Sequence, residues 1–398
     1  MDRGKRKKRQ RVICQMILIC IVNVMFSGIF VSYAQEEESS GTNISGELSD
    51  YDFSQVETFL KKQEGWNSWN LSFSEMLEKL MKGEGKEVAE AAVLAVRKGF
   101  FSEVRGNGKL LLQIILLGLA GAVFTNFSGV FTANQVSETG FFVTYLLIFS
   151  YLAVSFLASV SLTGEAMEKI LEFLKLLMPS YFMAVAFSGG SASSVALYET
   201  MFFTVSAVEW LFVNLLLPFM KIYLLLALAG NIAKEEMLSR LTELIKSGVT
   251  WSLKTVMGLV LGLNLLQGMI MPYVDAVKNS TMEKAVEAIP GIGRGAGIAA
   301  RLMLGSGILI KNTMGVTAAV ILLVLAAVPV IKLVILALMY QCAAAALEPV
   351  CDKRIVSCIG AAAEGHKILV KLLTYSVLLF IIVMAMVCSA TNAVYFGG

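Results

Sequence analysis

The chain has 398 residues, of which 57% are hydrophobic and 16% are charged, and its formal net charge is +3. A typical soluble domain is about a quarter charged, so this composition and the mean hydropathy of +0.72 exclude a disordered chain and an ordinary soluble enzyme. The small net charge excludes a nucleic-acid-binding protein, because such proteins carry a strongly basic face. The composition therefore indicates a protein whose main solvent is lipid.

A signal peptide is predicted at residues 1–34. Seven Lys or Arg residues lie among the first eleven, residues 12–31 carry no charge, and residues 32–34 end in Ala34 before a polar stretch. This order of basic, apolar and small-residue segments is typical of secretory signal peptides. We expect cleavage after Ala34, and an uncleaved membrane anchor is the alternative because the apolar run is long.

Residues 35–108 are polar and are predicted to be helical, membrane-adjacent and exported, since a signal peptide precedes them. Apolar residues recur there at three- and four-residue spacing. The residues that share one helical face are Phe73, Met76, Leu77, Leu80 and Met81. Ser72 and Glu75 have the spacing of a capping box at the start of this helix. A solvated linker is the alternative interpretation of the segment.

A multipass membrane domain is predicted over residues 109–398. Its apolar runs are 110–131, 141–162, 173–190, 197–216, 218–232, 249–271, 313–340 and 368–390. Most are close to the roughly 20 residues that cross a hydrocarbon core of about 30 Å. Pro179, Pro218 and the stretch with Gly189 and Gly190 interrupt the longest apolar block, so its short runs could be re-entrant. The predicted fold class is all-α, with about eight transmembrane helices (roughly seven to nine).

Two segments between these runs are predicted to lie outside the hydrocarbon core. Residues 233–248 combine charges with an apolar face, which predicts an interfacial amphipathic helix. Residues 272–312 are predicted to be an amphipathic or loop segment between two spans, and their five Lys and Arg residues leave the parity of the spans open under the positive-inside rule. Gly258 and Gly262, in the run between these segments, have the Gly-x-x-x-Gly spacing that lets a partner helix approach closely.

The glycine-rich stretch EAIPGIGRGAGIAARLMLGSGILIKN at 287–312 raises the question of a phosphate-binding loop. A dinucleotide fold needs a strand before the glycines, and a P-loop needs Gly-Lys followed by Ser or Thr. Neither is present, so no cofactor is predicted. We interpret the stretch as a helix that ends at Pro290, a turn permitted by Gly291 and Gly293, and a tightly packed helix that ends at Lys311 and Asn312.

Charged residues inside the apolar runs are candidates for function. Glu199 and Lys221 lie near the ends of their runs, from where long side chains reach the interface. Glu209 and Lys332 lie nearer the middle of theirs and could pair, line a pore or join two helices. The one histidine, His366, is expected at the surface, at a membrane boundary. Without a second histidine, a zinc-protease motif, a serine-hydrolase motif or Cys-x-x-Cys, neither an enzyme nor a metal site is predicted.

Two parts of the chain carry a family resemblance. The first is LLMPSYFMAVAFSGGSASSVALYE, which contains Pro179, Gly189 and Gly190. The second begins with AIPGIGRGAG, continues through LGSGILIKNTMGV and AAVPVIKLVILALMYQCAAAALEPV, and contains Glu348 and Pro349. In combination these segments resemble the stage III sporulation protein AE family of endospore-forming Firmicutes. The signal peptide, the exported segment and the multipass domain agree with that family, so the resemblance covers nearly the whole chain.

The resemblance implies a non-enzymatic membrane component of the complex encoded by the stage III A operon, in the mother-cell membrane that surrounds the forespore. That complex is likened to a secretion system and forms a channel with a forespore-membrane partner. The implied partners are therefore sister subunits and, through them, the forespore-membrane protein, with residues 35–108 between the two membranes. The alternative is a stand-alone secondary transporter with a midplane site around Glu209 and Lys332.

Overall fold

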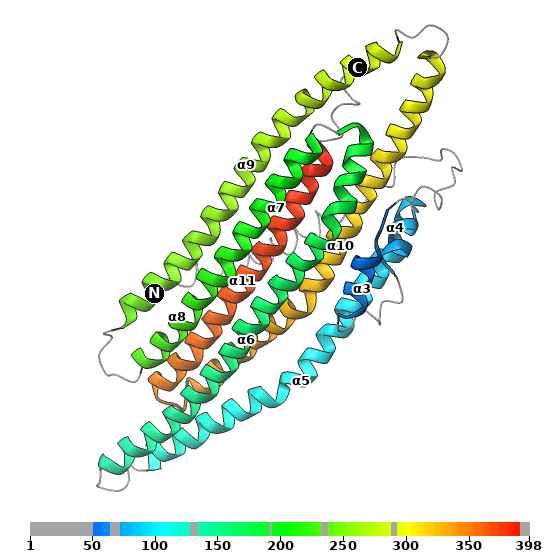
Figure 1. Ribbon diagram of the computed structural model, residues 1–398. Coiled ribbons are helices and arrows are strands. Elements are labelled where there is room, and N and C mark those ends of the chain that lie inside the picture. Colours follow the sequence, from blue (N-terminus) through cyan, green and yellow to red (C-terminus); the bar gives the residue numbers. More distant parts are fainter. Residues whose placement is uncertain are drawn as a thin grey trace, which may run out of the picture.

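The computed structural model describes residues 51–63, 72–127, 134–190, 193–231, 238–287 and 293–390. Every regular element in these ranges is a helix (Figure 1). The elements are α3 (Ser54–Lys61), α4 (Phe73–Met81), α5 (Gly85–Phe127), α6 (Asn134–Val185), the π-helix η3 (Ala186–Gly190), α7 (Ser193–Leu211), the π-helix η4 (Phe212–Leu216), α8 (Leu217–Gly230), α9 (Ser239–Glu287), α10 (Gly293–Leu347) and α11 (Lys353–Ala390). This confirms the predicted all-α fold, while the predicted signal peptide lies outside the described residues.

The long helices form an antiparallel bundle (Figure 1), in which α6, α9 and α11 run one way and α7, α8 and α10 run the other. In the described part of the chain, six segments are long and apolar enough to cross a membrane. They are Gly85–Val123, Thr139–Ser188, Leu197–Gly230, Ser239–Gln267, Gly305–Leu347 and Lys353–Cys388. The predicted multipass membrane architecture is therefore confirmed.

Six segments replace the eight predicted apolar runs because two predicted interruptions do not end a helix. The charged stretch between the runs at 141–162 and 173–190 does not end a helix, because α6 continues through it and through Pro179 as far as Val185. Pro218 stands at the first turn of α8, and η4 joins α7 to α8 without a gap. A proline lacks one N–H, but neighbouring helices and local π-type adjustments satisfy the freed backbone groups in membrane proteins. Neither Pro179 nor Pro218 therefore ends a helix.

The segment 272–312 is helical wherever the structure describes it, in agreement with the predicted helix, turn and second helix, but the second helix does not end at Lys311 and Asn312. Residues 272–287 continue α9, and α10 begins at Gly293 and passes through Lys311 and Asn312 to Leu347. The predicted interfacial helix at 233–248 is likewise not separate, since α9 begins at Ser239 and continues into the apolar run. Pro290 and Gly291, the predicted helix stop and turn, lie outside the described residues.

A small helical pair, α3 and α4, packs against the bundle beside α5, α6 and α10 (Figure 1). The predicted capping box of α4 is confirmed, because the Ser72 hydroxyl accepts the Glu75 N–H at 3.1 Å and the Glu75 carboxylate accepts the Ser72 N–H at 2.8 Å. Phe73, Met76 and Leu77 are buried on the predicted face. On α3, the ring of Phe59 lies 6.4 Å from that of Phe173 on α6.

The helices are much longer than a bilayer is thick. The 52 residues of α6 and the 55 of α10 span about 78 and 82 Å at 1.5 Å per residue, against a hydrocarbon core of about 30 Å. In α5, charged and exposed residues extend to Lys109, and residues 110–127 then carry no charge. The predicted boundary between the exported segment and the membrane domain at residue 108 thus lies inside one continuous helix.

The turn between α10 and α11 joins three helices at one end of the bundle. The Cys351 thiol donates to the Gly118 carbonyl of α5 at 3.2 Å, and the Arg354 guanidinium lies 3.7 Å over the Phe141 ring of α6. Asp352 accepts the Arg354 backbone N–H at 2.9 Å and so caps the start of α11. Burial alone raises the pKa of Asp352, but the hydrogen bonds and the charge of Arg354 together leave it below its ordinary value.

An added methyl group should have opposite effects on stability at two glycines of α11. A Cβ at Gly365 would lie 2.6 Å from the buried Phe156 ring, whereas a Cβ at Gly360 would meet nothing within 4 Å. We expect Gly365→Ala to destabilise the fold by about 1–3 kcal/mol through overpacking. Gly360→Ala should stabilise it by about 0.5–1 kcal/mol, because alanine favours the helix. Thermal unfolding of both variants in detergent tests this, and equal shifts would contradict it.

Candidate functional site

The two segments that carry the family resemblance meet in the structure. Gly307, in the LGSGILIKN part of α10, faces η3, which begins the Ser-Gly-Gly stretch. A Cβ on Gly307 would lie 3.0 Å from the backbone C and O of Phe187 and 3.0 Å from the N of Ser188. Only glycine allows the two backbones to approach so closely. We call this contact, with Tyr181, Lys311 and Cys388 beside it, the π-helix junction.

The five residues of η3 widen the last turn of α6 at this contact. The Ser188 side chain is buried, and its hydroxyl donates to the Val185 carbonyl at 2.8 Å. This hydrogen bond satisfies one backbone acceptor at the wider turn. Gly189 and Gly190 close the π-helix at its end. Single-turn π-helices are uncommon and occur frequently at functional sites, so this turn marks the junction as a candidate site.

Lys311 is fully buried at the junction, although lysine is almost never buried without a partner. Its ammonium Nζ lies 3.4 Å from the carbonyl oxygen of Cys388, near the last turn of α11. The carbonyl groups of a helix C-terminus carry partial negative charge and favour a cation there. Lys311 therefore fixes the end of α11 to α10.

The Cys388 side chain adds a second link at the same place. Its thiol lies 3.0 Å from the Tyr181 hydroxyl of α6, and a Cβ at Gly315 would lie only 2.5 Å from its sulfur. Next to Lys311, the Asn312 side-chain oxygen is buried without a hydrogen-bond partner among the described residues. Three helices, α6, α10 and α11, thus converge on one small group of side chains.

The segment that leads into α3 reaches the junction as well. The Ser180 hydroxyl of α6 donates to the Asp52 carbonyl at 3.0 Å, and the rings of Tyr51 and Phe187 meet edge to face at 6.4 Å. Pro179, beside Ser180, is exposed and interrupts nothing. The polar N-terminal segment and the π-helix are therefore held together by direct contacts.

His366 is fully buried, and the predicted surface position is wrong. Its Nε2 lies 3.0 Å from the Ser159 hydroxyl and its Nδ1 lies 2.8 Å from the Ala362 carbonyl. The rings of Phe156 and Tyr340 lie 5.1 and 5.0 Å from the imidazole. Both ring nitrogens are thus satisfied inside the bundle, between α6, α10 and α11.

The signal for this buried position was present in the sequence. The buried residues of α11 recur at three- and four-residue spacing, and His366 is one of them, in the series Ile359, Ala362, His366, Leu369 and Leu373. The flanking residues Gly365 and Lys367 favoured a surface assignment instead. Periodicity identifies the buried face of a helix better than local charge does.

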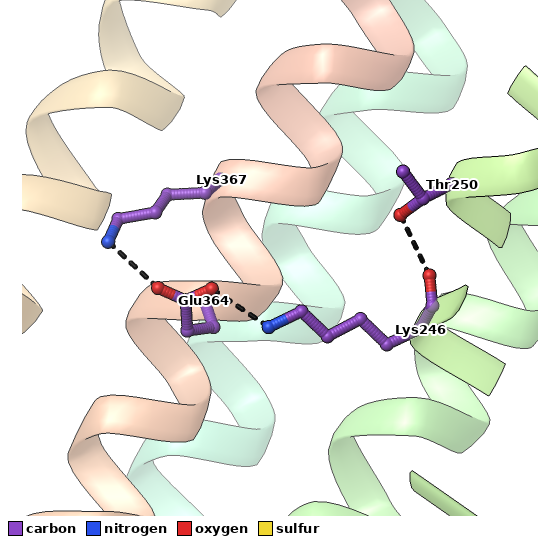
Figure 2. A network of polar contacts seen from close by, with 4 residues as sticks. All are labelled: Lys246, Thr250, Glu364 and Lys367. Atoms are coloured by element: carbon purple, nitrogen blue, oxygen red, sulfur yellow. Dashed lines mark hydrogen bonds and ion pairs between the residues drawn. The ribbon is translucent and has the colours of Figure 1, made fainter. Parts of the chain in front are cut away.

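A network of charged side chains joins α9 to α11 (Figure 2). The Glu364 carboxylate lies 3.0 Å from the ammonium of Lys246 on α9 and 2.9 Å from that of Lys367 on α11. The Thr250 hydroxyl donates to the Lys246 carbonyl at 2.8 Å. The sequence prediction did not select Glu364, because it lies in what was taken for a loop between two spans.

The remaining predicted site residues are dispersed. Glu209 of α7 has Lys175 and Glu168 of α6 as its charged neighbours, and the described ion pairs do not join it to Lys332 of α10. Gly258 and Gly262 lie on an open face of α9. Gly293 is the first residue of α10, and Glu348 and Pro349 are exposed in the turn after it. No three His, Cys, Asp or Glu side chains within the described ranges could hold a metal ion.

The ion pair between Glu364 and Lys246 predicts how strongly α9 is held against α11. Glu364→Gln leaves Lys246 without its counter-charge on α11, so amide hydrogen exchange in residues 239–254 should accelerate by up to about fivefold, the effect of a half-exposed ion pair worth at most about 1 kcal/mol. Lys367→Gln removes only the pair within α11 and serves as the matched control. Equal acceleration in both variants would contradict the assignment.

Comparisons with known proteins identify the family of the chain. The family model of stage III sporulation protein AE matches residues 71–391, which include both segments of the π-helix junction. The stage III sporulation protein AE of Bacillus subtilis (strain 168) is 24% identical over 338 residues, covering 83% of this chain and 85% of that protein. No solved structure matches. The chain belongs to the stage III sporulation protein AE family.

Proposed function

We propose that this chain is a non-enzymatic component of a channel complex that connects the mother cell with the forespore and is required for endospore formation. Its family makes it a sporulation-related protein, and the six apolar helical segments among the described residues make it a membrane protein. The channel role, the mother-cell membrane and the placement of residues 35–108 between the two membranes are part of the proposal. So are the partners, sister subunits and a forespore-membrane protein.

The observation that carries the proposal is the construction of the π-helix junction. Its residues come from α6, η3, α10 and α11, and the backbone contact at Gly307 is made without a side chain between the helices. The ammonium of the buried Lys311 is hydrogen-bonded to the Cys388 carbonyl near the end of α11. Such an arrangement supports a rigid scaffold that holds the polar N-terminal segment in place, and rigidity of this kind suits a subunit of a large assembly.

The transporter alternative receives no comparable support. It placed a midplane site around Glu209 and Lys332, since transporters of this kind gather polar groups at helix breaks. In the structure, Glu209 lies beside charges of α6, and Lys332 lies within an uninterrupted α10. Neither residue lies in η3, and only Glu209 lies close in sequence to the second π-helix, η4, so the predicted pair does not share one helix break.

Removing the gene should separate sporulation from growth. In the organism that encodes the chain, we expect a deletion to leave vegetative growth unchanged and to block sporulation after engulfment, as measured by heat-resistant spore counts and fluorescence microscopy of membranes. A normal spore count in the deletion strain would overturn the proposal.

Complementation of that strain with glycine variants tests the junction. Gly307→Ala brings a methyl group against the backbone of η3 and should lose most of the spore yield, because overpacking of this kind costs about 1–3 kcal/mol and displaces η3. Gly305→Ala, two residues away, meets nothing within 4 Å and should restore wild-type yield. An immunoblot checks that both variants accumulate. Equal spore yields from the two variants would show that sporulation does not depend on the close contact at the π-helix junction.

The proposed partners are tested separately. An affinity-tagged copy of the full chain, purified from sporulating cells in mild detergent, should retain sister subunits of the stage III A complex. The matched control is the same tag on an unrelated multipass membrane protein. Recovery of the chain without any sister subunit, from cells that contain them, would contradict the proposed assembly.

A further inference from the structure

The outer face of α5, which lies along one side of the bundle (Figure 1), changes from basic to apolar within one turn. Arg105 and Lys109 are exposed on this face, and the side chains that follow on it are Leu112 and Leu116, exposed by 58% and 56%. Residues 110–127 carry no charge, and at 1.5 Å per residue they span about 27 Å, close to a hydrocarbon core of about 30 Å. One crossing of that core therefore accounts for the charge-free stretch, and Lys109 stands at its edge.

The neighbouring helix α6 changes character at the same level. The Tyr151 hydroxyl of α6 donates to the Gln113 side chain of α5 at 2.9 Å, so these two residues lie level. From this pair toward α3, Lys109 lies about 6 Å farther along α5 and Leu157 about 9 Å farther along α6. Leu157 is the last large apolar side chain that α6 exposes before its charged stretch, and the next large exposed side chain is Glu165. Both helices thus place the edge of the hydrocarbon core at one level.

The positions of Arg105 and Lys109 along α5 fit the headgroup layer of the bilayer. A bilayer about 40–45 Å thick with a core of about 30 Å leaves roughly 5–8 Å for the headgroups of each leaflet. Arg105 lies about 6 Å farther from the core than Lys109, so both cations fall within that layer. Arg97 and Lys98 lie about 10–12 Å beyond Arg105, which exceeds the layer and the screening length of about 8–10 Å in salt. The lower two cations are therefore the ones that meet lipid phosphates.

Arg105 and Lys109 form no ion pair within the described part of the chain. The ion pairs there neutralise other cations, namely Lys79, Lys82, Lys246, Arg354 and Lys367. Glu103, the acidic residue of α5 nearest to them in sequence, is held on the inner side of the helix, because its carboxylate accepts a hydrogen bond at 2.9 Å from the side chain of the buried Asn107. The outer face of α5 thus presents two positive charges that the described residues do not neutralise.

A glycine leaves open space between the two cations and the apolar stretch. Gly108 is exposed, and a Cβ there would meet nothing within 4 Å. Glycine weakens a helix relative to alanine, and packing among the described residues gives no reason for it at this position. Residues three and four apart share one face of a helix, so Gly108 lies between Arg105 and Leu112. The bare backbone there gives a headgroup room to reach both cations.

We propose that Arg105, Gly108 and Lys109 form a binding site for the phosphate headgroup of an anionic phospholipid, in the leaflet on the α3 side of the membrane. The guanidinium donates two parallel hydrogen bonds to a phosphate, and the ammonium adds a point charge. The acyl chains of the same lipid then lie along Leu112 and Leu116, which a free phosphate would leave uncovered. The site adds to the proposed channel role and does not depend on it.

Lipid titration of the full chain in detergent tests the site, with bound lipid counted by native mass spectrometry. We expect phosphatidylglycerol to bind more tightly than phosphatidylcholine. Arg105→Gln combined with Lys109→Gln should weaken phosphatidylglycerol binding by about 25-fold, roughly fivefold for each charge near an anionic surface, and leave phosphatidylcholine binding unchanged. Equal affinities of the parent chain for the two lipids would overturn the proposal.

Two controls separate a lipid site from net charge and from a soluble anion. Lys61→Gln combined with Lys62→Gln removes the same charge from α3, which meets α6 at Phe173, about 24 Å beyond Leu157. This variant should keep the parent affinity, and an equal loss in both double variants would overturn the site. Glycerophosphoglycerol, the headgroup without acyl chains, should not displace the lipid at equal concentration. Displacement would overturn the assignment to a lipid.

A glycine pair tests the space between the cations without changing the charge. A Cβ at Gly106 or at Gly108 would meet nothing within 4 Å, but Gly106 lies two residues away and so points to another side of α5. Gly108→Leu should weaken phosphatidylglycerol binding severalfold by filling the space, whereas Gly106→Leu should leave it unchanged. Thermal unfolding checks that both variants fold. Parent-like binding by Gly108→Leu would overturn the site, and these affinities do not depend on the spore counts above.

Discussion

The fold depends on backbone approach at glycine more than on any charged pair. Gly307 permits the π-helix of α6 to rest directly on α10, and that crossing determines where Tyr181, Lys311 and the end of α11 can lie. Lower in the bundle, Gly365 lets the side-chain ring of Phe156 rest against the backbone of α11. Since lipid offers little hydrophobic drive for helix association, close packing at small residues is the main force available to such a bundle.

The helical class, the membrane setting and the capping box at Ser72 could be predicted from the sequence, because each rests on a local pattern. Several helix ends could not, because Pro179 and Pro218 normally mark boundaries, yet α6 continues through Pro179 and η4 joins α7 to α8 at Pro218. The segments of the candidate site could be predicted, but their contact could not. Both segments were selected by their glycines, but their contact joins residues more than a hundred positions apart, which no local pattern reveals.

Charged residues were a less reliable guide to the candidate site than glycines were, because the significance of a charge depends on how deeply its side chain lies in the protein and in the membrane. His366 and Lys311 are buried and satisfied, whereas Glu209 and Lys332, selected for their apolar surroundings, are only half buried. Helices more than twice as long as the bilayer is thick carry apolar residues far beyond it. A charge in an apolar run therefore need not lie in lipid, and an apolar run need not cross the membrane.

The burial of Lys311 has a consequence for biogenesis. The ammonium is part of α10, but the Cys388 carbonyl beside it belongs to the last turns of the final helix, α11. The chain is synthesised from the N-terminus, so α10 is complete before that carbonyl exists. Until α11 arrives, the lysine lacks this acceptor, and burying an ammonium with fewer acceptors costs more free energy. Closure of this end of the bundle is thereby coupled to completion of the polypeptide.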